Sequence, residues 1–386
     1  MSLMPIERIP DWEKRLARQD AFWRCEVLDR PVVIMSLWKE NPAYPPPPQK
    51  TWRSLRERWW DTDHVAASAL YGTMNTQYLG DALPLAYPNL GPEVFSAFFG
   101  QELEYSEGTS WSIPVLKDWS KADDLQFDRD GIYFRQIVKM TDALLAAGKG
   151  RFYTGLIDFH PGGDALAAFR DPINLCTDLL EYPDDVKALT QRVTDVYLEV
   201  HDFFCDKLMA AGQAISSWPG IVSSKRWYVP SNDFSCMISK KMFDEFFLPG
   251  IAEECAHMDA SIYHLDGPGA LQHLDSLLSI KELNAIQWVY GAGRGRASDW
   301  LPVYKKCQAA GKGLQIGVGV DELDTIMENL KPEGVWLSIG GAKDVEHAEA
   351  LIKKVSGWRR GSVQVGGPRR LTLARRSSRR RRGPRA

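Results

Sequence analysis

The chain has 386 residues, of which 44% are hydrophobic and 25% are charged, and its formal net charge is -3. This size and composition predict one large domain with its own hydrophobic core. No apolar run approaches the roughly 18 residues that a membrane span needs, and the first residues lack the apolar stretch of a secretory signal. The six cysteines show neither disulfide-type nor metal-type spacing, which is typical of a reducing compartment. We therefore expect a cytoplasmic protein without a membrane partner.

Charge is divided unevenly along the chain. Residues 359–386 hold eleven arginines and no acidic residue, so subtracting these eleven positive charges from the whole-chain value of -3 leaves -14 on residues 1–358. An acidic body argues against nucleic acid as a partner of the folded part, whereas the tail alone could hold phosphate groups. The tail composition also predicts disorder. We expect a disordered basic end, or an appended extension, without a function of its own.

Short apolar runs bounded by turn residues recur along the chain with helical stretches between them, a pattern that predicts parallel strands joined by helices. Eight such strands close a barrel. We therefore predict an α/β fold in which residues 1–358 form a single (β/α)8 TIM barrel and residues 359–386 form the tail. The eight predicted strands are residues 31–35, 83–87, 152–157, 214–218, 260–265, 285–290, 313–318 and 334–339.

Helical segments separate the later strands at lengths that suit right-handed crossovers. These helices are predicted at residues 241–258, 297–310, 320–330 and 344–355. The long interval between the second and third strands contains alternating segments and a further helix. We predict that the alternating segments form a hairpin inserted over the barrel mouth; they are residues 102–105 and 110–115, with the helix near 135–147.

His264 and Asp266 end the fifth predicted strand, just before a Gly-Pro turn. Residues two apart on a strand point to the same face, so both side chains would reach the barrel mouth, where such enzymes carry their chemistry. Three interpretations stay open for this pair. It binds a metal, it serves metal-free acid/base chemistry or substrate binding, or it makes a structural His–Asp hydrogen bond.

Asp158 and His160 form a second carboxylate–imidazole pair at the end of the third predicted strand. Asp158 is a candidate third metal ligand or general base, and His160 is a candidate at the same rim. The alternative for Asp158 is a hydrogen bond to the turn amides before the helix that follows. Asp81 and Asp233 each adjoin a turn, so a catalytic or substrate-binding role and simple capping both explain them.

Trp218, Trp288 and Arg294 are further candidates for substrate binding. The two tryptophans lie near the ends of the fourth and sixth predicted strands, where they could wall an apolar pocket. Arg294 belongs to the glycine-rich run 290–296, whose amides could cradle an anion; the alternative is a plain flexible loop. The glycine spacing is not that of a dinucleotide-binding fingerprint.

Several of these landmarks together resemble the uroporphyrinogen decarboxylase superfamily, whose members share one (β/α)8 barrel and include decarboxylases and corrinoid-dependent methyltransferases. The most specific part is the helix entry at residues 237–249, followed by a strand that ends at His264. The resemblance spans roughly residues 9–358, and the segments that carry it are 80–84 (Gly-Asp-Ala-Leu-Pro), 90–92, 153–158, 232–249 and 263–267.

For the decarboxylase branch, the resemblance implies that Asp81 would hold the pyrrole nitrogens of the substrate. That branch also uses arginines near the N-terminus and a histidine on the last strand, whereas here the loop 36–41 offers only Lys39 and residues 338–342 contain no histidine. An acidic domain short of cations would repel an octacarboxylate. A carboxy-lyase acting on a smaller carboxylated substrate is therefore an alternative function.

For the methyltransferase branch, the strand that matches residues 262–266 ends His-x-Cys and binds zinc together with a later cysteine. This chain has His264 and, in place of that cysteine, Asp266; both side chains are competent zinc ligands. The resemblance implies a zinc-containing methyltransferase that moves a methyl group between a small substrate and a corrinoid (cobalamin) on a partner protein. A non-catalytic barrel that binds a corrinoid or another small ligand is the third alternative.

Overall fold

A mostly parallel β-sheet forms the centre of the molecule. The computed structural model describes residues 3–358, and in this part of the chain the longest hydrogen-bonded ladder runs in the order β2, β1, β13, β12, β11, β10, β9. All neighbours in it are parallel except β1 and β2. The strands of this ladder are β1 (Val32–Trp38), β2 (Thr76–Gly80), β9 (Trp227–Tyr228), β10 (Ala260–Asp266), β11 (Ala285–Val289), β12 (Gly313–Gly319) and β13 (Val335–Gly340).

Three short pairs complete the set of strands in the described residues. Two of these pairs are antiparallel, and the pair of β3 and β6 is parallel. A backbone hydrogen bond from Leu156 to Ser216 continues β6 toward β7. The paired strands are β3 (Leu85–Ala86) with β6 (Tyr153–Thr154), β4 (Leu103–Tyr105) with β5 (Ser110–Ser112), and β7 (Ile215–Ser216) with β8 (Val222–Ser223).

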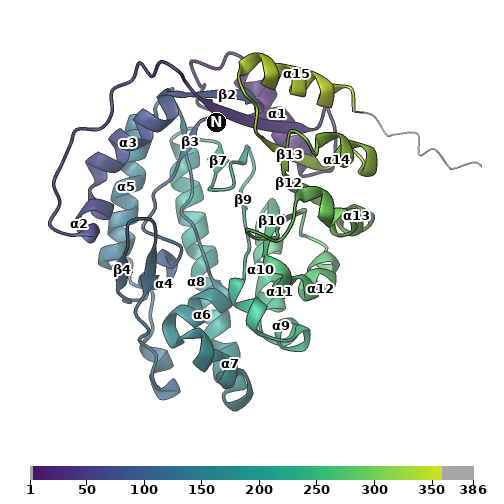
Figure 1. Ribbon diagram of the computed structural model, residues 1–386. Coiled ribbons are helices and arrows are strands. Elements are labelled where there is room, and N and C mark those ends of the chain that lie inside the picture. The colour runs from purple at the N-terminus through teal and green to yellow at the C-terminus, as the bar shows by residue number, and fades with distance from the viewer. Residues whose placement is uncertain (1–2, 359–386) are drawn as a thin grey trace, which may run out of the picture.

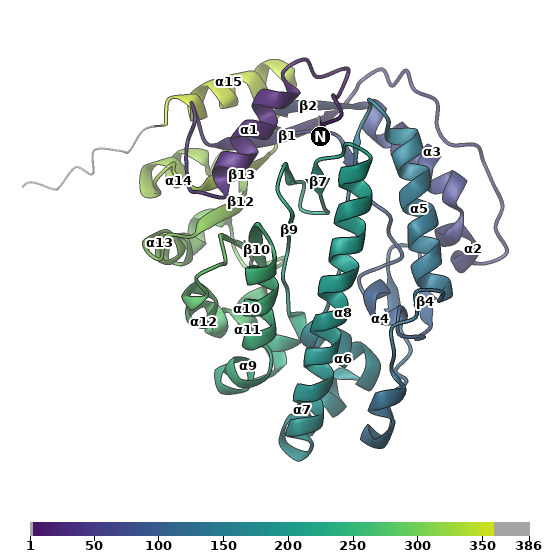
Figure 2. The ribbon, with the colours of Figure 1, turned by 180° about the vertical axis from the view of Figure 1, so that it is seen from behind.

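Helices cover the outside of these strands. Figures 1 and 2 show α3, α5 and α8 along one side of the strands and α12, α13 and α14 along the other. Among the described residues no helix combines the length and the apolar character needed to cross a membrane. The helices of the first half are α1 (Trp12–Phe22), α2 (Leu55–Trp60), α3 (Thr62–Met74), α4 (Val94–Ala97), α5 (Ile132–Gly148), α6 (Gly162–Arg170), α7 (Pro172–Glu181) and α8 (Pro183–Ala210). Those of the second half are α9 (Lys240–Phe246), α10 (Leu248–His257), α11 (Gly267–Ala270), α12 (Leu274–Ser279), α13 (Leu301–Ala309), α14 (Leu323–Asn329) and α15 (Val345–Ser356).

Each of the eight apolar runs predicted as strands contains a strand, so that part of the prediction is confirmed. Three strands, β2, β8 and β9, were not predicted, and the single helix predicted at residues 241–258 is divided into α9 and α10. Pro249 explains this break, because a proline starts a helix readily but cannot continue one. The predicted basic tail lies outside the described residues.

The predicted hairpin is present as β4 and β5, and it packs on the end of α6. The side-chain amide of Gln101 donates to the carbonyl oxygen of Ala168 at 2.6 Å, and the backbone N–H of Val115 donates to that of Phe169 at 2.8 Å. These bonds attach the hairpin to α6, the helix that follows β6 along the chain.

Asp81 differs from its predicted role, because the structure encloses it in a buried ion cluster. Its carboxylate is fully buried and bonds the guanidinium groups of Arg18 and Arg30, with the Arg18 contact at 2.9 Å. It also accepts the backbone N–H of Val33 at 3.0 Å. Because β2 runs antiparallel to β1, its end brings Asp81 to the beginning of β1 and away from the carboxyl ends of the parallel strands.

Replacing Asp81 should therefore cost stability. The substitution Asp81→Asn leaves the buried guanidinium of Arg30 without its counter-ion, while Arg18 keeps its pair with Asp29. We expect a loss of about 3 to 5 kcal/mol in the free energy of unfolding, measured by urea titration. Glu245→Gln, which removes an exposed ion pair with Lys187, is the control and should leave the unfolding midpoint unchanged. A fully stable Asp81→Asn protein would contradict the structural role.

Glu254 on α10 predicts a dependence of stability on pH. Only 2% of this residue is exposed, and burial, together with Asp164 and Glu253, raises its pKa well above the usual 4.5. The folded chain then holds a proton that the unfolded chain releases, so this contribution to stability is full below pH 4.5 and is lost as the pH rises toward the folded pKa.

The uncharged variant Glu254→Gln removes this titration. Above roughly pH 5 the stability of the wild-type chain should fall relative to the variant by about 1.4 kcal/mol per pH unit until the pH reaches the folded pKa. Urea unfolding of both proteins at several pH values measures this difference, in which other titrating groups cancel. Parallel pH profiles would show that Glu254 ionises normally in the folded chain.

Candidate functional site

Six acidic and imidazole side chains gather where β6, β9 and β10 end. Tyr228 of β9 positions the segment that follows β6. Its hydroxyl donates to the carbonyl oxygen of Ile157 at 2.7 Å and accepts the backbone N–H of Phe159 at 2.5 Å. Beyond β9 the chain stays beside β10, since Ser231 pairs with His264. These contacts gather Asp158, His160, Asp164, Asp233, His264 and Asp266.

His160 lies between two carboxylates. Its Nε2 is 3.3 Å from Asp158 and its Nδ1 is 3.2 Å from Asp164. Burial by itself would lower the pKa of His160, but the hydrogen bonds and charges of the two aspartates outweigh it and hold the pKa well above 6.5. His160 is therefore an imidazolium at neutral pH, and its positive charge stabilises the two carboxylates.

Asp164 ties α6 to the loop that carries Asp233. The carboxylate of Asp164 accepts the backbone N–H groups of Asp233 at 3.0 Å and Phe234 at 2.8 Å. The alternative considered for Asp158, a hydrogen bond to the turn amides before α6, is not seen, because its Oδ1 is buried without a hydrogen bond and lies 3.3 Å from His160. The carboxylate of Asp158 interacts with His160. Asp233 is held through its backbone N–H, so its side chain is available to bind another group.

Asp233, His264 and Asp266 can hold a metal ion. One ligand atom from each lies within 4.8 Å of the others. On β10 the less buried positions are His264 and Asp266 while Leu265 between them is 1% exposed, so the pair shares a face as predicted. The Oδ1 atom of Asp233 is buried without a hydrogen-bond partner, and a buried charge is stable only when it is paired or coordinates a metal.

The electrostatics of this group also favour a cation. Burial, reinforced by Asp164, raises the pKa of Asp233 to about 6. Among the described residues no lysine or arginine forms an ion pair with the carboxylates of Asp158, Asp164, Asp233 or Asp266. Imidazole nitrogen and carboxylate oxygen are donors that zinc accepts. The residues therefore fit a zinc ion or a similar divalent cation.

His264 is held on its other side by a row of polar groups. Its Nδ1 lies 2.5 Å from Oε1 of Gln287, which bonds Gln315 at 2.8 Å, and Gln315 donates to the carbonyl oxygen of Pro219 at 2.8 Å. The ring of Trp218 packs edge-on against the His264 ring, with centroids 5.1 Å apart. Trp218 therefore touches the site itself.

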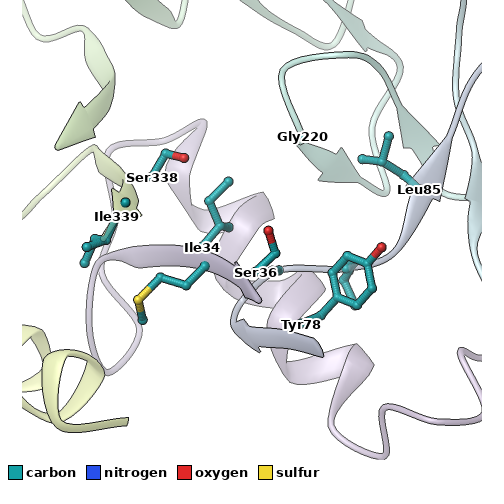
Figure 3. Close-up of a pocket in the computed structure, with 11 residues that line it drawn as sticks. Ile34, Ser36, Tyr78, Leu85, Gly220, Ser338 and Ile339 are labelled. Carbon is teal, nitrogen blue, oxygen red and sulfur yellow. The ribbon is translucent and has the colours of Figure 1, made fainter. Parts of the chain in front are cut away.

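Two cavities adjoin this row. The larger one, of about 510 Å³, is lined by Gln287 and Gln315 and by parts of the glycine-rich loop. The smaller one, of about 340 Å³, shares Ser338 with it. Figure 3 shows Ile34, Ser36 and Ser338 projecting toward the space that faces Gly220 in the smaller cavity. None of the residues lining either cavity is charged.

Two of the predicted binding residues lie farther from the cluster than expected. Trp288 contributes to the wall of the larger cavity, but it is only 4% exposed and its ring packs against Trp300 with centroids 5.0 Å apart. Its side chain therefore mainly packs β11 against the segment that carries Trp300. Arg294 is exposed on the glycine-rich loop, where its carbonyl oxygen accepts the indole N–H of Trp300 at 3.3 Å. The structure brings neither residue to the metal-type group.

Four residues of the site were missed from the sequence: Asp164, Tyr228, Gln287 and Gln315. The two glutamines carried a usable signal, because they stand inside apolar runs that were correctly predicted as strands. A polar residue at an inward position of a buried strand needs a partner. Asp164 and Tyr228 carried none, since their partners are backbone atoms of distant segments.

A second group of metal-type residues lies on the outer helices. His201 and Asp202 of α8 meet His257 of α10. Here Asp202 already pairs with Arg226 at 3.3 Å and with His257 at 3.0 Å. The guanidinium supplies the positive charge that the first group lacks, so this second group is explained by its own ion pairs.

No known protein-family model matches the chain, and no curated protein is significantly similar to it.

The site predicts one bound divalent ion per chain. Removing a ligand by Asp233→Asn or Asp266→Asn should weaken Zn²⁺ binding by about 100-fold or more, measured by isothermal titration and by metal analysis of the purified protein. Asp202→Asn, in the second group, is the matched control and should bind Zn²⁺ like the wild type. Equal loss in all three variants, or no binding by the wild type, would contradict the assignment.

Proposed function

We propose that this protein is a metal-dependent methyltransferase that moves a methyl group between a small substrate and a corrinoid carried by a partner protein. The observation that supports it most is the group of Asp233, His264 and Asp266 at the end of β10, next to a cavity of about 510 Å³. The reaction class comes from the resemblance of the strand ending in His264 and Asp266 to the zinc-binding strand of such methyltransferases.

The proposal includes a (β/α)8-type barrel. Its support is the run of parallel strands from β9 through β13 to β1, with β3 and β6 parallel beside them. In that architecture the carboxyl ends of the strands carry the chemistry. β9 would then be an additional strand of the barrel wall between β7 and β10. It is followed along the chain by the segment that carries Asp233.

The residues of the site have different roles toward the proposed cation. A bound zinc ion would supply positive charge to the heteroatom that carries the methyl group. Two carboxylates and one imidazole make that ion harder than cysteine ligands would, which favours an oxygen or nitrogen substrate over a thiol. His160, already paired with Asp158 and Asp164, keeps those two carboxylates from competing for the cation.

The decarboxylase alternative has less support. Its key residue, Asp81, is fully buried and bonded by Arg18 and Arg30, so it has no surface to offer a substrate. The uncharged linings of both cavities provide no cation for a carboxylated ligand. These two observations favour methyl transfer over loss of carbon dioxide.

Methylation of free cob(I)alamin tests the proposal. Methanol, methylamine and methanethiol are offered as methyl donors, and formation of methylcobalamin is followed by its absorbance spectrum. We expect zinc-loaded protein to use the oxygen or nitrogen donor, and His264→Ala to lose about 100-fold or more of the rate. Asp202→Asn is the control and should keep full activity.

Three outcomes would overturn the proposal. They are turnover that survives complete removal of the metal, release of carbon dioxide from small carboxylic acids with no methyl transfer, and saturable binding of cobalamin without turnover of any donor.

A further inference from the structure

Three polar side chains stand at one level across three neighbouring strands. His264 of β10 pairs with Gln287 of β11, and Gln287 pairs with Gln315 of β12. Side chains at paired positions of adjacent strands point to the same face of the sheet and touch one another. The register of the sheet, rather than any loop, therefore builds the row.

The far end of the row fixes the direction of every hydrogen bond in it. The carbonyl oxygen of Pro219 can only accept, so Gln315 must present its Nε2 amide there, at 2.8 Å. Its Oε1 then faces Gln287 and accepts from Nε2 of that residue at 2.8 Å. Gln287 is left with Oε1 toward His264 at 2.5 Å, and only a protonated Nδ1 can donate to that oxygen.

We propose that Gln287 and Gln315 are positioning residues that hold His264 in the tautomer with the proton on Nδ1, leaving the lone pair of Nε2 for a cation beside Asp233 and Asp266. The edge of Trp218 packs against the same ring and restrains its rotation. The assignment of a cation as the partner of Nε2 rests on the proposed function, whereas the tautomer does not.

A row of this kind acts on a ligand histidine without touching the cation. The acceptor on Nδ1 orients the ring and makes Nε2 more basic, and losing such a partner costs about 10- to 100-fold in metal affinity. Gln287 and Gln315 also line the larger cavity, so the same two side chains would meet a substrate placed there.

Nitrogen-15 NMR of the metal-free protein at about pH 8, above the ordinary pKa of histidine, reads the tautomer directly. His264 is assigned among the seven histidines by its loss in His264→Ala. We expect a protonated Nδ1 and a bare Nε2 in the wild type. Gln287→Glu keeps an acceptor and should keep this tautomer, whereas Gln287→Leu removes the acceptor and should give a mixture.

Gln315→Leu supplies an independent variant, because it leaves Gln287 intact but frees its amide to turn over. Both leucine variants should lose about 10- to 100-fold in Zn²⁺ affinity, measured by isothermal titration. Gln308→Leu, which removes a half-buried glutamine outside the row, bonded to the carbonyl oxygen of Lys331, is the control and should change neither readout.

The outcomes separate this inference from the proposed function. A wild-type protein with the proton on Nε2, or folded leucine variants with unchanged tautomer and affinity, would overturn the positioning role. A wild-type protein with the proton on Nδ1 that binds no Zn²⁺ would leave the positioning role intact and overturn the metal-dependent function instead.

Discussion

The register of β10 against β11 and β12 is the constraint on which the candidate site depends. It sets His264 beside Gln287 and Gln287 beside Gln315, and through the alternation of β10 it also sets Asp266 on the face of His264. A shift of one residue in any of these strands would turn its side chains to the opposite face. The packed residues between them, such as Leu265 at 1% exposure, oppose that shift by their burial.

Positive charge is distributed unevenly among the carboxylates of the site. Asp158 and Asp164 share the imidazolium of His160, and Asp164 also accepts two backbone N–H groups. The charges of His160 and His264 lower the pKa of Asp233, but burial and Asp164 outweigh them and raise it to about 6. The Oδ1 atom of Asp233 is also buried without a hydrogen bond. A buried carboxylate with a raised pKa beside an oriented imidazole is the feature that makes this group a candidate site.

The sequence could predict those parts of this arrangement that depend on local patterning. Alternation along one strand was enough to place His264 and Asp266 on the same face, and apolar runs were enough to locate eight strands. Asp233 could not be assigned as their partner, because it begins the short 3-10 helix Asp233–Met237, whose position depends on β9, a strand of two residues. Asp81 was misjudged because the antiparallel course of β2 has no local signature.

The boundary between the charged cluster and the uncharged cavities constrains where a substrate would react. A neutral ligand gains by burial in a cavity without charges, while a cation is stable only beside the carboxylates. Gln287 is the residue that belongs to both regions, since it bonds His264 and lines the larger cavity. If the protein transfers a methyl group as proposed, the heteroatom that carries it would lie next to Gln287, with the rest of the substrate extending toward Ser338, where the second cavity begins.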